Sequence, residues 1–544
     1  MTSKQFFPLE LPISRGYSLP PWSTVVALLN ASQIDNLLQD NLRLLIEALH
    51  TEDRRDLQFA IATLIECNSE GEVLIQSLAL ISEKYHLGQL LLAVLKDAHI
   101  NLQNNRDRIE LVLAVLAEDW RNSREGGLDM CLQVDANGYC LTGWIDDWFN
   151  DAYLVIQTNK RLFRQLIGPA RLERADVATG LMSGNQHSYG FAINIQLSGE
   201  QLEGAWIGTK FLMGVPKDLR ALPFIEARKT FARLLPAFNR NKLQLRNLIE
   251  KTIGPAIYAL GRGGSLYEGL ENPDRLVDCN FVFGQIECES LQIIVPLYKC
   301  WHFLRIQLKL IEALAKHRPK EIRLTYVVDD PSIVDELMGW IGNNHEIFEV
   351  AMDVLILNSN QGFAMANFLG CRLSKSKYVL LMNSDVLPCA DDWAGLLMES
   401  LDNDTSLGAI APTLLFPNAS LQHGGMKPVQ LLHDYGFISN IHPGKGLRPD
   451  QPCSPQYLVE SLTGACLILR REVLDEVGGF NPLFGQGDFE DLEFSLRLKN
   501  AGYQLALRSD ICFTHLERQS YVQDVNPETQ WQTWINSWLA EVLI

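Results

Sequence analysis

Three apolar segments in the C-terminal half of the sequence end in polar side chains. Residues 324–328 are followed by Asp329 and Asp330, and two later segments are followed by residues 358–360 and 383–385. One such ending is ordinary, because Asp, Ser and Asn often cap the helix that follows a strand. Three endings at one edge of a sheet predict a crevice for a polar ligand.

A second group of acidic side chains lies in FEDLEF, residues 489–494. Adjacent carboxylates such as Glu490 and Asp491 usually belong to the solvated face of a helix. This pair, however, follows the glycine-containing loop GFNPLFGQGD. A carboxylate positioned beside a hydroxyl group can act as a general base. The pair is therefore the second candidate for chemistry in this sequence.

From about residue 288 the sequence alternates between apolar strands and helical patterns. The expected strands are LQIIVPLY, IRLTYVVDD, DVLILNS and YVLLMNSD. Strands that alternate with helices predict a parallel sheet, whose ligands bind at the carboxyl ends of the strands. The expected fold class is therefore α/β, with a Rossmann-like, mostly parallel sheet over residues 286–525.

Three segments precede this region. Residues 1–125 carry Leu and Ala at helical spacing, which predicts an α-helical packing or interaction domain. Residues 126–215 contain short alternating segments and an Asn-Gly turn, which predict a β-sandwich-like module. Residues 216–285 predict a helical connector, in which GRGGS (residues 261–265) is typical of a flexible joint. That glycine cluster is not a phosphate loop, because no strand precedes it and no GK[ST] follows.

The last segment, residues 526–544, predicts an amphipathic helix. Six apolar side chains fall on one face: Trp531, Trp534, Ile535, Trp538, Leu539 and Val542. This face either packs against the core of the chain or meets a dimer partner or a membrane surface.

Composition excludes several classes of function. The chain has 544 residues and a formal net charge of -18, which argues against nucleic acid as a partner. Its 11 cysteines have no metal-like spacing and indicate reduced thiols in a cytoplasmic protein. Residues 1–20 lack the basic start and apolar stretch expected of a signal peptide, and no uninterrupted apolar run reaches the length expected of a transmembrane helix. Any membrane contact is therefore expected to be peripheral, at the inner face.

The motifs of the C-terminal half resemble a known family. The segment from IIVPLY through VVDD to LNSNQGFAMANFLGCRLSKSKYVLLMNSD is similar to the family-2 glycosyltransferases of the GT-A fold. LTGACLILRREVLDEVGGFNPLFGQGDFEDLEFSLRLKNAGY resembles the acceptor half of that family. The rhamnosyltransferase-like branch is the most similar, because it also tends to carry Asn-x-Asp in place of Asp-x-Asp.

Residues 126–215 resemble a small β-sandwich module that accompanies some bacterial glycosyltransferases. The shared skeleton consists of Gly143-Trp144, Ala170-Arg171, Arg174, Asp176 and Gly190-Phe191. Arg174 and Asp176 either pair across a turn or bind sugar.

The family resemblance implies a divalent metal, Mg2+ or Mn2+, at the diphosphate of a nucleotide-sugar donor. Asp385 would be the first metal ligand. Asn383 replaces the usual first aspartate and would offer an amide oxygen to the metal or a contact to the ribose. His515 stands where many members carry a metal ligand, although a lone histidine is often structural.

The resemblance also assigns the remaining substrate contacts. Pro296 and Tyr298 would border a UDP-, dTDP- or GDP-linked donor, either Asp329 or Asp330 would face the base, and Asn360 would lie near it. A carboxylate suits that position because it accepts the imide N–H of uracil or thymine.

On the acceptor side, Asp491 would be the catalytic base and Glu490 its partner. Thr463, Gly464 and Ala465 match the strand of small residues that approaches the sugar. Glu493 would either bind the acceptor or cap the helix.

The implied function is an inverting, metal-dependent transfer of a sugar to a hydroxyl of a glycan or polysaccharide, in bacterial polysaccharide biosynthesis. A catalytically lapsed scaffold that binds glycan or protein is the alternative; Asn383 favours it, and the intact Asp385, Glu490 and Asp491 count against it. A nucleotidyltransferase would require a glycine-rich basic loop after the first strand, and IIVPLYKCWHF has none.

Overall fold

The computed structural model describes fourteen segments of the chain. These are residues 126–145, 153–159, 162–167, 172–173, 189–207, 210–211, 216–232, 242–284, 289–315, 319–373, 375–430, 437–449, 454–517 and 527–544. The α-helical domain predicted for residues 1–125 lies outside the described residues, as do Arg174 and Asp176. The chain divides into two compact units, Met1–Leu132 with Tyr139–Lys217, and Gln133–Gly138 with Asp218–Ile544.

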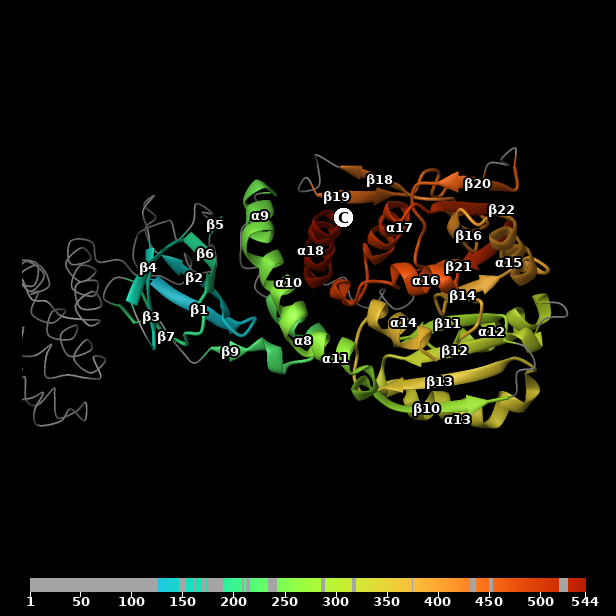
Figure 1. Ribbon diagram of the computed structural model, residues 1–544, viewed down its shortest axis with the longest axis horizontal. Helices are drawn as coiled ribbons and strands as arrows, with labels where there is room; N and C mark the ends of the chain where they lie inside the picture. Colours follow the sequence, from blue (N-terminus) through green and yellow to red (C-terminus); the bar gives the residue numbers. More distant parts are fainter. Residues whose placement is uncertain are drawn as a thin grey trace, which may run out of the picture. The chain divides into compact units, whose positions relative to one another are not determined.

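The described part of the first unit is built from β-strands (Figure 1). They are β1 (Gly126–Gln133), β2 (Gly138–Ile145), β3 (Tyr153–Thr158), β4 (Leu162–Leu166), β5 (Leu172–Glu173), β6 (Tyr189–Gln196), β7 (Leu202–Ile207), β8 (Lys210–Phe211) and β9 (Lys217–Asp218). One sheet has the order β5-β6-β2-β1-β9 and the other β4-β3-β7-β8. Alternate residues of both sheets share one apolar core, including Leu141, Ile156, Phe191 and Ala205. The predicted β-sandwich is therefore present.

The second unit begins with helices that pack together. They are α8 (Phe224–Ala232), α9 (Lys242–Leu248), the π-helical turn Ile249–Ile253, α10 (Gly254–Gly263) and α11 (Ser265–Glu271). The flexible joint predicted for GRGGS is wrong, since most of these residues lie in α10 and Ser265 begins α11. Gly261 is buried, and a Cβ on it would lie 2.1 Å from Leu483 Cδ2. Glycine is needed there for close packing, not for flexibility.

An 11-stranded mixed sheet forms the body of the second unit (Figure 1). Its strands are β10 (Val277–Phe283), β11 (Leu291–Leu297), β12 (Ile322–Val328), β13 (Ala351–Leu357), β14 (Tyr378–Met382), β15 (Val386–Pro388), β16 (Leu407–Leu415), β17 (Leu421–His423), β20 (Gln456–Val459), β21 (Cys466–Arg470) and β22 (Gln504–His515). The main order is β10-β13-β12-β11-β14-β21-β16-β22-β15, and β17 and β20 pair with β16 and β22.

The four predicted strands are parallel neighbours. β11 pairs in parallel with β12 and β14, and β12 with β13. Their carboxyl ends therefore lie at one edge, as the alternation of strands and helices predicts. The α/β fold class is confirmed for this unit.

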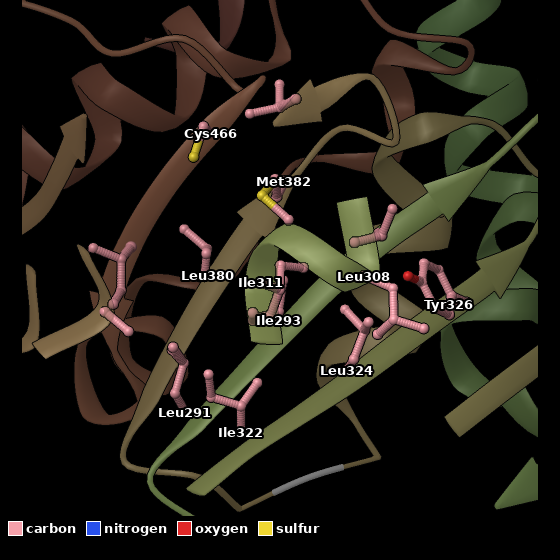
Figure 2. Packing of buried hydrophobic residues seen from close by; sticks show 14 of the residues in the cluster. Leu291, Ile293, Leu308, Ile311, Ile322, Leu324, Tyr326, Leu380, Met382 and Cys466 are labelled. Atoms are coloured by element: carbon pink, nitrogen blue, oxygen red, sulfur yellow. The ribbon is translucent and has the colours of Figure 1, made fainter. Parts of the chain in front are cut away.

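Helices cover both faces of the sheet. The apolar faces of α12 (Leu304–Leu314), α13 (Val334–Asn344) and α15 (Trp393–Asn403) share a core with one face of the strands. Figure 2 shows Leu308 and Ile311 of α12 against Ile293, Leu324 and Leu380. α14 (Phe363–Cys371) packs on the other face, where a Cβ on Gly370 would lie 2.7 Å from Ile294 Cγ2.

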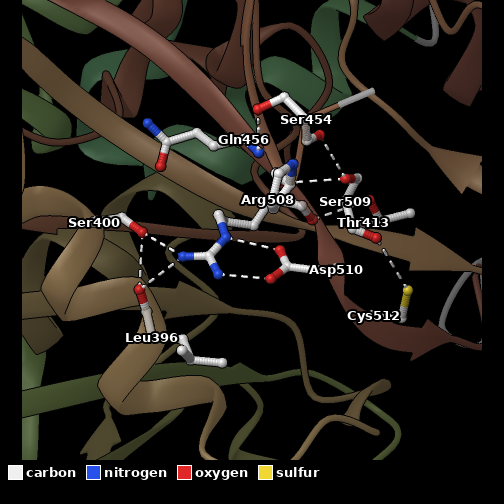
Figure 3. A network of polar contacts seen from close by, with 10 residues as sticks. Leu396, Ser400, Thr413, Ser454, Gln456, Arg508, Ser509, Asp510 and Cys512 are labelled. Carbon is white, nitrogen blue, oxygen red and sulfur yellow. Dashed lines mark hydrogen bonds and ion pairs between the residues drawn. The ribbon is translucent and has the colours of Figure 1, made fainter. Parts of the chain in front are cut away.

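A polar network fixes the register of β22 (Figure 3). The strand is bulged, because Pro412 of β16 pairs with Arg508 whereas the adjacent Thr413 pairs with Cys512. Arg508 spans the bulge by donating from Nη2 to Asp510 at 2.7 Å and from Nη1 to Ser400 Oγ of α15 at 2.6 Å. The last residues of β22 are thereby held in a defined register, which delivers His515 to the edge of the sheet.

The chain closes with α16 (Arg471–Val477), α17 (Glu490–Asn500) and α18 (Pro527–Leu543). On α18, Ile535, Trp538 and Leu539 are buried, and Val542 is exposed. A Cβ on Gly254 of α10 would lie 2.5 Å from the Trp538 ring, so this part of α18 packs against its own unit. Among the described residues, no helix has the length and apolarity that crossing a membrane requires.

Candidate functional site

The turn at residues 383–385 follows β14 and is held by hydrogen bonds from both sides. The Asn383 N–H donates to the Ala465 carbonyl at 2.9 Å, which joins the turn to the residue preceding β21. Gln307 of α12 donates from Nε2 to the Asn383 carbonyl at 2.8 Å and to the Val386 carbonyl at 2.9 Å. The backbone of the polar turn is therefore fixed before any ligand binds.

Asp385 and His515 are brought together by strand pairing. Val386 of β15 pairs with His515 at the end of β22, and the Leu516 N–H donates to the Asp385 carbonyl at 3.1 Å. His515 Nε2 lies 3.3 Å from Asp385 Oδ1, and both side chains are buried. A carboxylate and an imidazole separated by 130 residues of sequence thus form one polar group.

The residues around this pair fit a divalent cation. His515 Nδ1 and Asn383 Oδ1 are buried and have no protein hydrogen-bond partner among the described residues. An orphaned amide oxygen beside a carboxylate suits Mg2+ or Mn2+, which favour oxygen ligands. The described residues contain no group of three or more His, Cys, Asp or Glu side chains arranged to hold a metal. The chain offers a partial ligand set, which needs oxygen atoms from a substrate or water to complete it.

Asp329 and Asp330 have different environments at the end of β12. The buried Asp329 carboxylate accepts the Gln361 N–H at 2.6 Å and the Gly362 N–H at 2.9 Å. Burial raises the pKa of Asp329 to about 7, although the two backbone hydrogen bonds oppose that shift. Asp330 is only partly buried and accepts the Lys299 N–H at 3.1 Å. Asp329 therefore holds the loop after β13, and Asp330 is the more accessible carboxylate.

The other predicted nucleotide contacts lie at the same edge. Pro296 and Tyr298, at the end of β11, are both partly buried. The Oδ1 of Asn360 is buried and has no protein partner among the described residues. This amide can therefore receive a hydrogen bond from a bound ligand.

The loops of the two predicted half-sites are in close contact. Gly362 has a φ of +89°, and a Cβ there would lie 2.2 Å from the Gly485 carbonyl oxygen. Only glycine fits both this left-handed backbone and this approach. The loop after β13 is thus packed directly against the loop that precedes Glu490 and Asp491.

Asp491 is held against the strand of small residues. Its Oδ2 accepts the Gly464 N–H at 3.0 Å, and its Oδ1 accepts the Leu492 N–H at 2.7 Å; the Thr463 side chain also hydrogen-bonds it. A Cβ on Gly464 would lie 3.4 Å from Asp491 Cβ. Because Ala465 binds Asn383, one short segment connects Asp491 to the polar turn at residues 383–385.

The two adjacent carboxyl groups have different proton affinities. Burial, followed by the charge of Asp491, raises the pKa of Glu490 well above its usual value. Burial raises the pKa of Asp491 to about 6, while hydrogen bonds from Gly464 and Leu492 limit the shift. The pair therefore holds its proton more readily on Glu490, and Asp491 is the more readily ionised carboxyl group. The Glu490 Oε2 atom is buried and has no protein partner among the described residues.

Glu493 has a structural partner. Its carboxylate binds Arg497, with Oε2 2.7 Å from Nη2 and Oε1 2.8 Å from Nε. Arg497 also donates to the Val477 and Gly479 carbonyls at 2.6 and 2.8 Å. These contacts attach the end of α16 to α17. They support neither acceptor binding nor helix capping, the two roles expected for Glu493.

Two further histidines lie near this group and carry no motif that the sequence analysis could detect. His423 of β17 is fully buried, and both its ring nitrogens are without a protein partner among the described residues. Its ring centroid is 5.6 Å from that of His442. Burial, with the charges of His442, His515 and Lys445, lowers the pKa of His423 well below its usual value. Both His423 and His442, whose pKa burial lowers to about 4, are therefore neutral at pH 7.

Comparison with known proteins identifies the segment that contains this site. Residues 292–478 match the glycosyl transferase family 2 model, and residues 448–541 match glycosyl transferase family 21. The O-antigen biosynthesis protein RfbC of Myxococcus xanthus is 29% identical over 172 residues, which is 30% of this chain and 13% of RfbC.

Other similar proteins cover different shares of the chain. A putative polypeptide N-acetylgalactosaminyltransferase 13 of Drosophila melanogaster is 24% identical over 235 residues, which is 41% of each chain. The structure of GalNAc-T7 with UDP, GalNAc and Mn2+ aligns at 13% identity and a TM-score of 0.36 over 46% of this chain and 48% of its own. The chain spans between 13% and 41% of the length of the curated relatives it matches.

Proposed function

We propose that the protein transfers a sugar from a nucleotide-diphosphate donor to a hydroxyl of a glycan or polysaccharide, because residues 292–478 match the glycosyl transferase family 2 model. One observation carries the proposal. The ionised Asp491 is hydrogen-bonded to Gly464, and the adjacent Ala465 is hydrogen-bonded to the turn that contains Asp385. The proposed base is thereby connected through the backbone to the polar edge of the sheet at which the nucleotide-sugar donor would bind.

Asp491 is the base of the proposed reaction. As the acceptor oxygen attacks the anomeric carbon, its proton passes to the Asp491 carboxylate. The bond between the anomeric carbon and the diphosphate oxygen breaks, and the diphosphate leaves with the electron pair. A single displacement inverts the anomeric configuration. Glu490, whose pKa is raised by burial and by the charge of Asp491, can donate a hydrogen bond from its protonated form to a substrate oxygen and so orient it.

Asp385, His515 and the Asn383 amide oxygen are the residues that would hold Mg2+ or Mn2+. A bound cation would neutralise charge on the departing diphosphate. Asp330, Asn360, Pro296 and Tyr298 would border the nucleoside. The distinct contacts of Asp329 support Asp330 as the carboxylate that faces the base, because Asp329 already holds the backbone of residues 361 and 362.

The proposal is tested by release of the nucleotide diphosphate from UDP-, dTDP- and GDP-sugars, with and without Mn2+ and a mixture of oligosaccharide acceptors. Transfer from at least one donor supports it. Binding of glycan without turnover of any donor would support the lapsed scaffold instead.

The pH dependence of kcat/KM should reveal the base. Because burial raises the pKa of Asp491 to about 6, protonation should remove activity as the pH falls through about 6. An unperturbed Asp, at about 3.9, would place this loss near pH 4. Rates measured between pH 4.5 and 8 distinguish the two cases, and a flat profile down to pH 4.5 would exclude a base with the raised pKa of Asp491.

Glu490→Gln should stabilise the fold at neutral pH while raising the acceptor KM. The pKa of Glu490 is raised in the folded state, so the folded chain binds more protons than the unfolded chain above the ordinary pKa of about 4.3. Wild-type stability therefore falls as the pH rises above that value, whereas the variant lacks this loss. We expect a higher Tm for the variant at pH 7.5 and no gain near pH 4. An equal Tm difference at both pH values would contradict the assignment.

A further inference from the structure

The loop in front of Asp491 has a backbone conformation that must be held in place. Asp488 and Phe489, which precede α17, have φ values of +81° and +71°. Such left-handed conformations are unfavourable for side chains of this size and persist where the surroundings enforce them. The surroundings of this loop include two helices, α8 and α18.

Asn536 of α18 supplies most of that restraint. Its Nδ2 lies within hydrogen-bonding distance of three loop carbonyls, those of Phe484 at 3.0 Å, Gly487 at 2.8 Å and Asp488 at 2.9 Å. The side chain is fully buried, and its Oδ1 accepts a hydrogen bond from Arg228 Nη2 at 2.6 Å. The Asn536 amide group thus contacts three carbonyl groups of the loop that precedes Glu490.

Arg228 of α8 completes the restraint from the other side. Its Nη1 donates to the Leu483 carbonyl, and a Cβ on Gly485 would lie 3.1 Å from the same nitrogen. Among the described residues no carboxylate pairs with this buried guanidinium, whose pKa burial lowers to about 10. A buried, charged arginine without a carboxylate is costly for stability. Because Arg228 binds only a loop carbonyl and the Asn536 amide oxygen among these contacts, its role is to hold the loop rather than to stabilise the fold.

We propose that Arg228 and Asn536 are positioning residues for Asp491, which set the backbone of residues 483–489 so that the carboxylate faces the donor half of the site. This inference rests on the proposed function. The same loop contacts Gly362 of the donor half through Gly485. Arg228 and Asn536 therefore also fix the distance between the donor half and the acceptor half of the site. Arg228 lies outside both segments that match known families.

Asn536→Asp separates positioning from packing. The new carboxylate keeps the size of the side chain and an acceptor for Arg228, but it cannot donate to the three loop carbonyls. A displacement of about 1 Å in a catalytic group can cost about 100-fold in rate. We expect kcat to fall about 10- to 100-fold, with the dissociation constant for UDP or another nucleotide diphosphate unchanged within about twofold.

Ser537→Ala is the matched control. Ser537 is the next residue of α18, is also buried, and binds the Ile438 carbonyl instead of the loop. It should leave kcat within about twofold of wild type. Hydrogen exchange of residues 483–489 should be faster in Asn536→Asp than in Ser537→Ala, which is a readout independent of turnover.

The outcomes distinguish this inference from the proposed function. A wild-type protein that turns over no nucleotide-sugar counts against the proposed function. An active wild type whose Asn536→Asp variant keeps its kcat and its loop protection overturns the positioning role. If Asn536→Asp does not fold, Arg228→Lys provides the test: it keeps the charge but replaces the planar fork that reaches both the Leu483 carbonyl and Asn536 Oδ1. This variant should lower kcat about threefold without weakening nucleotide binding, and an unchanged kcat overturns the inference.

Discussion

Asp491→Asn should lower kcat by about 10²- to 10⁴-fold, the usual contribution of a general base. A sugar hydroxyl is a poor nucleophile at neutral pH, and the amide cannot take its proton. The loss corresponds to about 3 to 5 kcal/mol of barrier. Binding of the nucleotide diphosphate should change by less than about twofold, because Asp491 contacts Gly464 and Leu492, which lie outside the predicted nucleotide edge.

Asp475→Asn is the control for this variant. Asp475 carries the same chemical change at an exposed position on α16 and has no role in the proposed site. Its kcat should remain near that of wild type. Near-normal turnover by Asp491→Asn, measured as initial rates at saturating donor, would remove the assigned base.

Asp385→Ala should have the second large effect, with kcat falling by about 10²- to 10³-fold, a loss typical of removing one electrostatic stabiliser. The buried pair formed with His515 and the orphaned Asn383 oxygen are the reasons to expect a cation here. Treatment of the wild type with EDTA should reproduce the loss.

Calorimetry gives this prediction a second readout. Wild type should bind the nucleotide diphosphate more tightly with Mn2+ than without it, and Asp385→Ala should show no such difference. Asp404→Ala removes a partly buried carboxylate that accepts the Ser406 N–H and should keep the metal effect. Full activity of Asp385→Ala in the presence of EDTA would show that the assigned metal site is wrong.

The positions of the polar strand ends could be predicted from the sequence because the signals are local. Apolar segments that stop at Asp329 or at residue 383 identify strands and their carboxyl ends, and the parallel pairing of β11, β12, β13 and β14 follows from the alternation with helices. The different surroundings of Asp329 and Asp330 could not be predicted, because the backbone groups that bind Asp329 belong to another loop.

The residues that support the site were missed for a related reason. Arg228 and Asn536 are 308 residues apart, and no motif relates them. Glu493 differs, because Arg497 follows it by four residues on the same helix, a spacing at which opposite charges commonly pair. That spacing is a local signal for a structural role, and the family motif obscured it. GRGGS was misread because glycine permits flexibility in a loop and close packing in a helix.

The configuration of the first product tests the central claim most directly. Each nucleotide-sugar is incubated with the protein, Mn2+ and oligosaccharide acceptors, and the anomeric proton of the newly formed glycoside is recorded by NMR. Direct displacement assisted by Asp491 predicts a glycoside of configuration opposite to that of the donor. A glycoside of retained configuration, or no transfer from any UDP-, dTDP- or GDP-sugar, would contradict the account.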